Sequence, residues 1–314
     1  LDVGEGKEHI NQEAAKTTGD AKPFQKNPAR KAANEAVSQD ELTSIEEALA
    51  LLEEEVGDDR KKEPVKPENE MIEENIDIQT ANGSMNTFVV FPEEDGPHPV
   101  VFFLMDAPGK REELHDMARR LASVGYFVVL PNLYYRRSRD FYLKERTPEA
   151  MEVMFGHMAT LNAQTSQTDT QAMLKFVDTH AMADQTRIGA VGYCMSGPIV
   201  MWIAAQFPDR FQSIASIHGA NMATNEPDSP HLMAPQIKCE SYFACAEIDK
   251  WAPPEDIQKL EASLIMAKSN YRIEWYPKVE HGFVFPLRAG IYNAKGAERH
   301  WERLFSLFER TLKS

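Results

Sequence analysis

Five consecutive apolar residues, Val100–Leu104, strongly limit the folds that are open to this chain. A strand without polar alternation needs cover on both faces, which is typical of a parallel sheet between two layers of helices. Residues 111–124 follow with apolar side chains at helical spacing, and apolar runs alternate with helical segments to the end of the chain. This alternation predicts an α/β fold with one doubly wound, mostly parallel sheet and helices on both faces.

The expected elements span about 240 residues, which suits one domain. The dipeptide Asn82-Gly83 is a hairpin turn signal that joins the first two strands. The predicted strands lie at 76–80, 85–91, 100–104, 126–130, 188–192, 214–218, 237–245 and 271–276. The predicted helices lie at 111–124, in two segments within 148–180, and at 195–206, 255–268 and 297–312.

The first 70 residues differ in composition from the rest of the chain. They are rich in Glu, Lys, Ala and Gln, poor in aromatic residues, and carry about half of the net negative charge. Such a segment buries too little apolar surface to offset its ordering entropy, so we predict an acidic, low-complexity leader at 1–70 and the α/β domain at 71–314. Helical spacing and a capping pair within the leader predict an amphipathic helix near 40–56, on Leu42, Ser44, Ile45, Glu47, Leu49, Leu52 and Val56. That helix is either transient and solvated or docked, on the domain or on a second subunit of a homo-oligomer.

Composition also excludes several classes of partner. A formal net charge of −15 argues against a nucleic-acid surface and against anionic membranes. No apolar run is long enough to span a bilayer, and residues 1–30 lack the pattern of a secretion signal. Three cysteines are too few for a disulfide framework and suggest a reducing compartment, with Cys239 and Cys245 interpreted as core packing. We therefore expect a cytoplasmic protein whose partner is a small molecule.

Cys194 lies at the apex of a predicted strand-to-helix turn, within Gly192-Tyr193-Cys194-Met195-Ser196-Gly197. Such an elbow exposes the apex side chain above the sheet and aims backbone N–H groups and a helix N-terminus at whatever that side chain attacks. The elbow needs small residues two places before and after the apex, and Gly192 and Ser196 meet that need. Ser196 fits less well as the apex, because Pro198 then stands two places on.

Two more polar side chains follow predicted strands, where functional residues of a doubly wound sheet collect. Asp249 follows the strand at 237–245, and His281 follows the strand at 271–276. The order nucleophile, acid, histidine is that of α/β-hydrolases. His281 would take the thiol proton and return it to the leaving group, while Asp249 would fix the imidazole tautomer. A helix N-terminus and a histidine beside Cys194 would both favour the thiolate.

Each of these residues has a simpler explanation when it is taken alone. A cysteine after a strand is more often buried packing, a histidine there is more often a loop residue, and an aspartate is usually a helix N-cap. His218 also ends a predicted strand, but it precedes the acid in the chain. His115, His157 and His300 fall within predicted helices and are interpreted as surface or packing residues. No His, Cys and Asp cluster has the spacing of a zinc site, so we predict neither a metal nor a cofactor.

Four short motifs carry a resemblance to a known family. They are the Gly192–Gly197 elbow, similar to Gly-Tyr-Cys-x-Gly-Gly; Asp249 followed by Pro253; Tyr276-Pro277 leading to His281-Gly282-Phe283; and Pro131-Asn132-Leu133-Tyr134, similar to Pro-Asp-Leu-Tyr. From about residue 75 to 312 the chain resembles the dienelactone hydrolases, or carboxymethylenebutenolidases. The resemblance implies an α/β-hydrolase fold and hydrolysis of an ester or lactone through an acyl-thioenzyme.

The same resemblance implies roles for further residues. Asp106 stands where the family typically has a glutamate that rests against the thiol until substrate binding frees the thiolate. The backbone N–H groups of Ala107 and Met195 match the oxyanion hole. Arg136 matches an arginine that resembles a carboxylate binder, with a solvated loop charge as the alternative. The family's second arginine is Phe285 here, which suggests a less anionic substrate.

Aromatic residues near these motifs are the remaining candidates for substrate binding. They could line an apolar pocket or equally be ordinary core and rim residues, and they are Tyr134, Tyr135, Trp251, Phe283 and Phe285. The leading expectation is therefore a hydrolase with a Cys-His-Asp triad. The alternatives are a non-catalytic binding or regulatory protein that kept the fold, and a thioesterase or acyl transferase.

Overall fold

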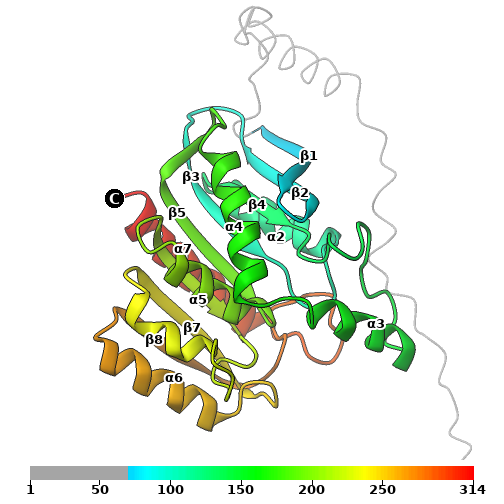
Figure 1. Ribbon diagram of the computed structural model, residues 1–314, viewed down its shortest axis with the longest axis vertical. Helices are drawn as coiled ribbons and strands as arrows, with labels where there is room; N and C mark the ends of the chain where they lie inside the picture. Colours follow the sequence, from blue (N-terminus) through cyan, green and yellow to red (C-terminus); the bar gives the residue numbers. More distant parts are fainter. Residues whose placement is uncertain (1–69) are drawn as a thin grey trace, which may run out of the picture. The chain divides into compact units, whose positions relative to one another are not determined.

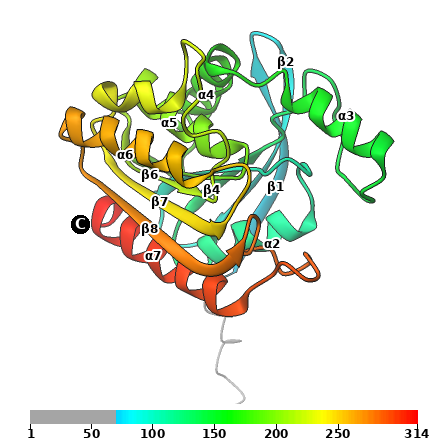
Figure 2. The ribbon, with the colours of Figure 1, turned by 90° about the horizontal axis from the view of Figure 1, so that it is seen from below.

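The computed structural model describes residues 70–314, which form one eight-stranded sheet with helices on both of its faces (Figures 1 and 2). The leader helix that the sequence predicts near 40–56 lies outside the described residues. The strands are β1 (Met71–Thr80), β2 (Gly83–Pro92), β3 (His98–Leu104), β4 (Phe127–Pro131), β5 (Ala183–Tyr193), β6 (Phe211–Ile217), β7 (Glu240–Ile248) and β8 (Tyr271–Glu280). The helices are α2 (Glu112–Ala122), α3 (Pro148–Met158), α4 (Ala163–Val177), α5 (Ser196–Gln206), the 3₁₀ helix η2 (Pro230–Gln236), α6 (Pro254–Ala267) and α7 (Ala294–Leu312).

The strand order across the sheet is β1-β2-β4-β3-β5-β6-β7-β8. β1 and β2 form the predicted hairpin, in which Thr80 pairs with Gly83, and β2 pairs antiparallel with β4. The strands β4, β3, β5, β6, β7 and β8 are parallel to one another. The carboxyl ends of β3, β5, β6, β7 and β8 therefore meet at one edge of the sheet, where ligands bind in folds of this kind.

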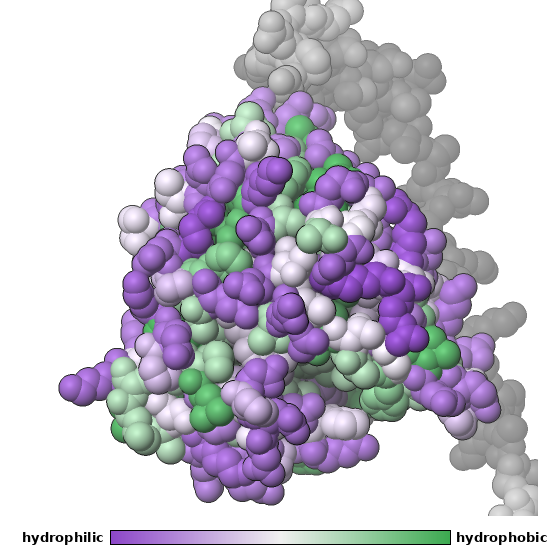
Figure 3. Space-filling view, in the orientation of Figure 1, coloured by the Kyte–Doolittle hydropathy of each residue, from purple (hydrophilic) through white to green (hydrophobic). Residues whose placement is uncertain are grey.

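Helices cover both faces of the sheet. α4 and α5 pack on one face, and α2 and α7 pack on the other (Figure 2). α7 is amphipathic and buries Trp301, Leu304 and Phe308 against the sheet while its opposite face is polar. Hydrophilic side chains dominate the face of the domain seen in Figure 3, and apolar side chains appear there in small separate groups. Every helix within residues 70–314 is too short or too polar to cross a membrane.

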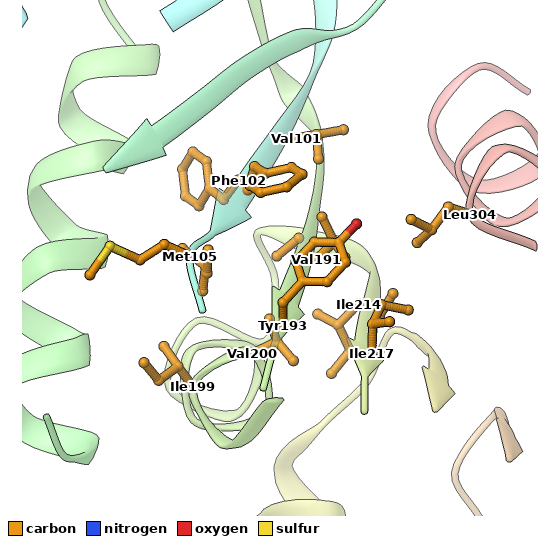
Figure 4. Close-up of a cluster of buried hydrophobic side chains, with 14 of the residues drawn as sticks. Val101, Phe102, Met105, Val191, Tyr193, Ile199, Val200, Ile214, Ile217 and Leu304 are labelled. Carbon is orange, nitrogen blue, oxygen red and sulfur yellow. The ribbon is translucent and has the colours of Figure 1, made fainter. Parts of the chain in front are cut away.

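The core lies on both sides of β3, whose seven residues are all buried. Figure 4 shows Val101 and Phe102 of β3 beside Val191 of β5, with Ile199 coming from α5 and Leu304 from α7. Burying each such side chain contributes roughly 1.5–3 kcal/mol to stability. The continuous apolar run that predicted a doubly covered strand is thus the centre of the sheet.

The predicted fold class and order of elements are confirmed, with two differences in detail. β8 continues past Tyr276 to Glu280, so His281 follows the strand directly. Pro277 can lie within β8 because this strand is at the sheet edge, where one side of the backbone needs no ladder hydrogen bond. The 3₁₀ helix at Pro230–Gln236 was not expected, since two prolines in seven residues obscure any helical period.

Candidate active site

Cys194 occupies a tight turn between β5 and α5. Its backbone has φ of 55°, in the left-handed region that a residue with a Cβ adopts only under strain. The Cys194 N–H donates to the carbonyl of Ile217 at 3.1 Å, and the Cys194 carbonyl accepts from the N–H groups of Gly197 and Ala220, both at 3.0 Å. These bonds fasten the turn to the end of β6 and hold the strained residue in place.

Small residues allow this turn to close. A Cβ at Gly192 would collide with the carbonyl group of Ser196, so glycine is required there. Ser196 is fully buried, and its hydroxyl donates to the carbonyl of Met105 at 2.5 Å. The Ser196 hydroxyl is therefore already engaged, and Cys194 is the side chain at the apex.

His281 and Asp249 form a close pair at the neighbouring strand ends. His281 Nδ1 lies 2.7 Å from Asp249 Oδ2, while Asp249 Oδ1 accepts a hydrogen bond from the N–H of Trp251 at 2.9 Å. A carboxylate on Nδ1 fixes the tautomer in which Nδ1 carries the proton. Both carboxylate oxygens are engaged, so the ring is oriented from behind and Nε2 is the nitrogen left to act.

Electrostatics couple His281 to Cys194. Burial alone would lower the pKa of His281, but the neighbouring Cys194 and the hydrogen bond to Asp249 together raise it to about 9. The Nε2 atom is buried and bonds to no nitrogen or oxygen of residues 70–314. Cys194 is the neighbour that raises the pKa of this ring most, so the two side chains are coupled.

Two backbone amides beside the elbow are free. Within residues 70–314, the N–H groups of Ala107 and Met195 make no hydrogen bond. Three contacts tie their segments together: Ser196 Oγ to the Met105 carbonyl, and Tyr134 Oη to both the Ala107 carbonyl at 2.9 Å and Met195 Sδ at 3.1 Å. Fixed, unpaired N–H groups of this kind are what an oxyanion hole requires.

Asp106 is fully buried, and two arginines hold its carboxylate. Oδ1 accepts from Arg111 at 2.5 Å, and Oδ2 accepts from Arg288 at 2.6 Å. Arg111 also pairs with Glu113 at 2.6 Å, and Glu113 accepts from the N–H of Leu287. The structure shows Asp106 bound to these guanidinium groups, whereas the resemblance implied a carboxylate resting on the thiol.

The model of the dienelactone hydrolase family matches residues 85–312, which include the elbow, Asp249 and His281. The chain belongs to the dienelactone hydrolase family. The "Putative carboxymethylenebutenolidase" of Synechocystis sp. is 27% identical over 245 residues, which cover 76% of this chain and 96% of that protein. The family places this chain among the ester and lactone hydrolases of dienelactone hydrolase type.

Solved structures support the same fold. The "Putative Dienelactone Hydrolase" of Klebsiella pneumoniae superposes with a TM-score of 0.70 at 23% identity, over 77% of this chain and 100% of that one. A dienelactone hydrolase-like promiscuous phosphotriesterase from metagenomic libraries superposes with a TM-score of 0.65 at 18% identity, over 77% and 98% of the two chains. At these identities the similarity shows the α/β architecture alone.

In this member of the family, Arg136 is engaged away from the triad. It pairs with Asp169 of α4 at 2.6 Å and with Asn82 of the β1–β2 turn at 3.0 Å. Asp169 is almost fully buried and also accepts from Tyr135 Oη at 2.8 Å. Arg136 is thus neither a solvated loop charge nor a free cation, because it ties the first hairpin to α4.

The aromatic residues predicted to bind substrate fall into two groups. Phe283 and Phe285 have no exposed surface, and Tyr134 is buried behind the loop that carries Ala107. The Arg288 guanidinium lies 4.5 Å from the centre of the Phe285 ring, which places Phe285 under the arginines that hold Asp106. Tyr135 is partly buried and its hydroxyl is bound to Asp169, and Trp251, at 39% exposure, is the most exposed of these aromatics.

Two arginines near the site were missed by the sequence reasoning. Arg111 and Arg288 are 177 positions apart in the sequence and carry no spacing signal, although Arg111 stands five residues after Asp106. His218 is fully buried, and its ring meets that of His281 edge to face at 4.7 Å. Burial, His281 and Arg288 hold the pKa of His218 far below its usual value, so its ring is neutral. Within the described part of the chain, no three His, Cys, Asp or Glu side chains are placed to hold a metal ion.

Proposed function

We propose that this protein hydrolyses carboxylic esters or lactones with Cys194 as nucleophile, His281 as acid and base, and Asp249 as the residue that orients His281. One observation carries the proposal. Cys194 stands on a strained strand-to-helix turn and raises the pKa of a histidine whose other nitrogen is 2.7 Å from a buried carboxylate. Strain and charge coupling at one side chain are typical of an activated nucleophile.

The first half of the reaction forms the acyl-thioenzyme. The Cys194 thiolate attacks the carbonyl carbon, and the carbonyl π electrons move to oxygen to give a tetrahedral oxyanion. The free N–H groups of Ala107 and Met195 would stabilise that charge. The carbon–oxygen bond to the leaving group then breaks, and His281 gives its Nε2 proton to the departing alkoxide. With a lactone, the alcohol stays attached to the acyl group.

The second half releases the acid. His281 Nε2 takes a proton from water, the resulting hydroxide attacks the thioester carbon, and the carbon–sulfur bond breaks to restore the thiolate. Asp249 keeps Nδ1–H in place through both halves, which lets one nitrogen alternate between acid and base. Asp106 could reach the thiol only after leaving Arg111 and Arg288, so in this arrangement the histidine supplies the activation.

Hydrolysis of p-nitrophenyl esters tests the proposal. We expect Cys194→Ala to lower kcat/KM by about 10³-fold or more, because the nucleophile of such a triad acts as a unit with its base. Mass spectrometry of the wild type during turnover should find one acyl group on Cys194. Cys239→Ala is the matched control, since burial raises the pKa of that thiol to about 12 and it should keep full activity. Equal rates of hydrolysis by the wild type and Cys194→Ala would show that Cys194 is not the nucleophile, and no hydrolysis by the wild type would favour a binding protein.

A further inference from the structure

A cavity of about 280 Å³ opens beside the elbow. It lies between α5, the end of α3, the start of α4 and the segment that follows β6. Its lining includes Met195, the residue after Cys194, and Ala220, whose N–H donates to the Cys194 carbonyl at 3.0 Å. A ligand in this cavity would therefore contact the residue that follows the proposed nucleophile in the chain.

The walls of the cavity are largely apolar. Met158, Leu161, Ile199 and Trp202 contribute to them from three helical regions. Trp202 Nε1 donates to the backbone carbonyl of Asp228 at 2.7 Å, so the one polar atom of the indole is already engaged. The cavity can hold roughly nine non-hydrogen atoms if each takes about the 30 Å³ of a water molecule.

Charge around this cavity has one sign. Glu226 and Asp228 line it, and among the described residues that form its walls there is no lysine or arginine. Neither carboxylate forms an ion pair within residues 70–314. A ligand with a carboxylate would meet like charges and would lose its hydration in an apolar cavity.

The arginines near the triad do not compensate, because buried carboxylates already neutralise them. Arg111 and Arg288 share Asp106, and Arg111 also binds Glu113. Arg136 binds Asp169. Each of these three arginines therefore has an acidic partner.

We propose that this cavity binds the apolar part of an uncharged ester or lactone, and that the protein discriminates against substrates that carry a carboxylate. This inference rests on the proposed hydrolase function and adds the substrate class. Met158, Leu161, Ile199 and Trp202 provide the apolar surface, and Glu226 and Asp228 provide the repulsion.

A pair of nearly isosteric substrates tests the discrimination. p-Nitrophenyl pentanoate ends in a methyl group where the p-nitrophenyl monoester of glutaric acid ends in a carboxylate. We expect the wild type to hydrolyse the pentanoate with a kcat/KM at least 10-fold higher. The double variant Glu226→Gln/Asp228→Asn should raise kcat/KM for the glutarate monoester several-fold relative to that for the pentanoate, because it removes the two charges but keeps side-chain size and the Asp228 carbonyl that holds Trp202.

A second series tests the apolar wall. Trp202→Ala and the more conservative Trp202→Phe should lower kcat/KM for the pentanoate by a larger factor than for p-nitrophenyl acetate, which is too short to fill the cavity. Trp275→Ala is the matched control, since Trp275 is 39% exposed on β8 and does not line the cavity. Equal kcat/KM values for the two isosteric esters, or parallel losses on acetate and pentanoate in both Trp202 variants, would overturn the inference.

The outcomes separate this inference from the function on which it rests. If Cys194→Ala abolishes hydrolysis but the wild type accepts both esters equally, only the substrate class is wrong. If the wild type hydrolyses neither ester, or if its activity survives Cys194→Ala, the hydrolase proposal fails and this inference fails with it.

Discussion

Two groups of buried polar residues lie at the same edge of the sheet and are built in opposite ways. Around Asp106, both carboxylate oxygens accept hydrogen bonds from arginines, and the charges of Arg111 and Glu113 are paired as well. Around Cys194, the Nε2 atom of His281 has no nitrogen or oxygen partner within residues 70–314, and two neighbouring amides are free.

The two groups differ in whether their buried polar atoms have partners, and this difference indicates where chemistry can occur. A buried polar atom without a partner costs free energy. A set of such atoms around one strained thiol therefore indicates a site where a ligand supplies the missing partners. A cluster whose charges cancel mainly holds its neighbours in position. The comparison therefore separates the proposed machinery at Cys194 from the proposed support at Asp106, and the following experiments test that separation.

The largest expected effect is on the reactivity of the thiol. Because the pKa of His281 is raised to about 9, its ring stays protonated across neutral pH, next to the sulfur atom of Cys194. Alkylation of Cys194 by iodoacetamide should therefore be nearly constant from pH 6 to 8 in the wild type. In His281→Asn it should fall by about 10-fold or more at pH 6 and rise steeply with pH, as for an ordinary thiol.

Labelled peptides identified by mass spectrometry give the measurement. Cys245 is the internal control, because burial raises the pKa of its thiol to about 12 and it should stay unlabelled in both proteins. A steep pH dependence in the wild type would remove the distinction between the two groups, since Cys194 would then behave as an unactivated thiol.

A large effect on stability is expected at the arginine cluster. Asp106→Leu removes the carboxylate that pairs with Arg288 and one of the two carboxylates that pair with Arg111. Breaking such a buried pair lowers the free energy of unfolding by about 3–5 kcal/mol. Urea denaturation measures that loss. Asp209→Leu is the control, because Asp209 pairs with Lys238 on the surface and should change stability very little.

The same variant also tests whether Asp106 takes part in activating the thiol. If Asp106 only holds the arginines in place, Asp106→Leu should keep the flat pH profile of Cys194 alkylation at temperatures where the variant is folded. A profile that becomes as steep as that of His281→Asn would instead place Asp106 within the machinery that activates the thiol.

The smallest expected effect is an acid sensitivity of stability that comes from neutral, buried histidines. Burial lowers the pKa of His300 to about 4 and holds that of His218 far below 6.5. Below about pH 6.5 the unfolded chain binds protons that the folded chain excludes, so stability is lost as pH falls, by at most about 1.4 kcal/mol per pH unit for each ring.

The urea midpoint measured between pH 7 and 5 tests this sign. His218→Phe removes one of these rings and should flatten the slope relative to the wild type. A wild-type midpoint that is constant or rises on acidification would show that these rings are not held neutral, and His218 would then be a candidate for proton exchange with His281.

Much of the fold could be predicted because its signals are local. The apolar run of β3, the Asn82-Gly83 turn and the glycine before Cys194 each act through neighbours in the chain, so their effects can be read in short windows. The order of Cys194, Asp249 and His281 could be predicted for the same reason, since each follows a strand.

The pairing of charges could not be predicted in this way. Arg288 meets Asp106 across 182 positions, and Arg136 meets Asp169 of α4 across 33, with no periodicity that relates either pair. Phe283 and Phe285 were expected at a pocket because aromatic residues suit both pockets and cores, and only the packing of α7 and the arginines decides between them. Long-range ion pairs and burial of loop residues depend on the assembled fold.

The left-handed backbone at Cys194 lowers the stability of the fold at the same position that carries the proposed nucleophile. Glycine would adopt φ of 55° without penalty, whereas a residue with a Cβ is strained there. An inactive chain with glycine at this position would therefore outlast the protein under heat or denaturant. The strain at this position is thus a cost in stability that accompanies the sulfur atom of the proposed nucleophile.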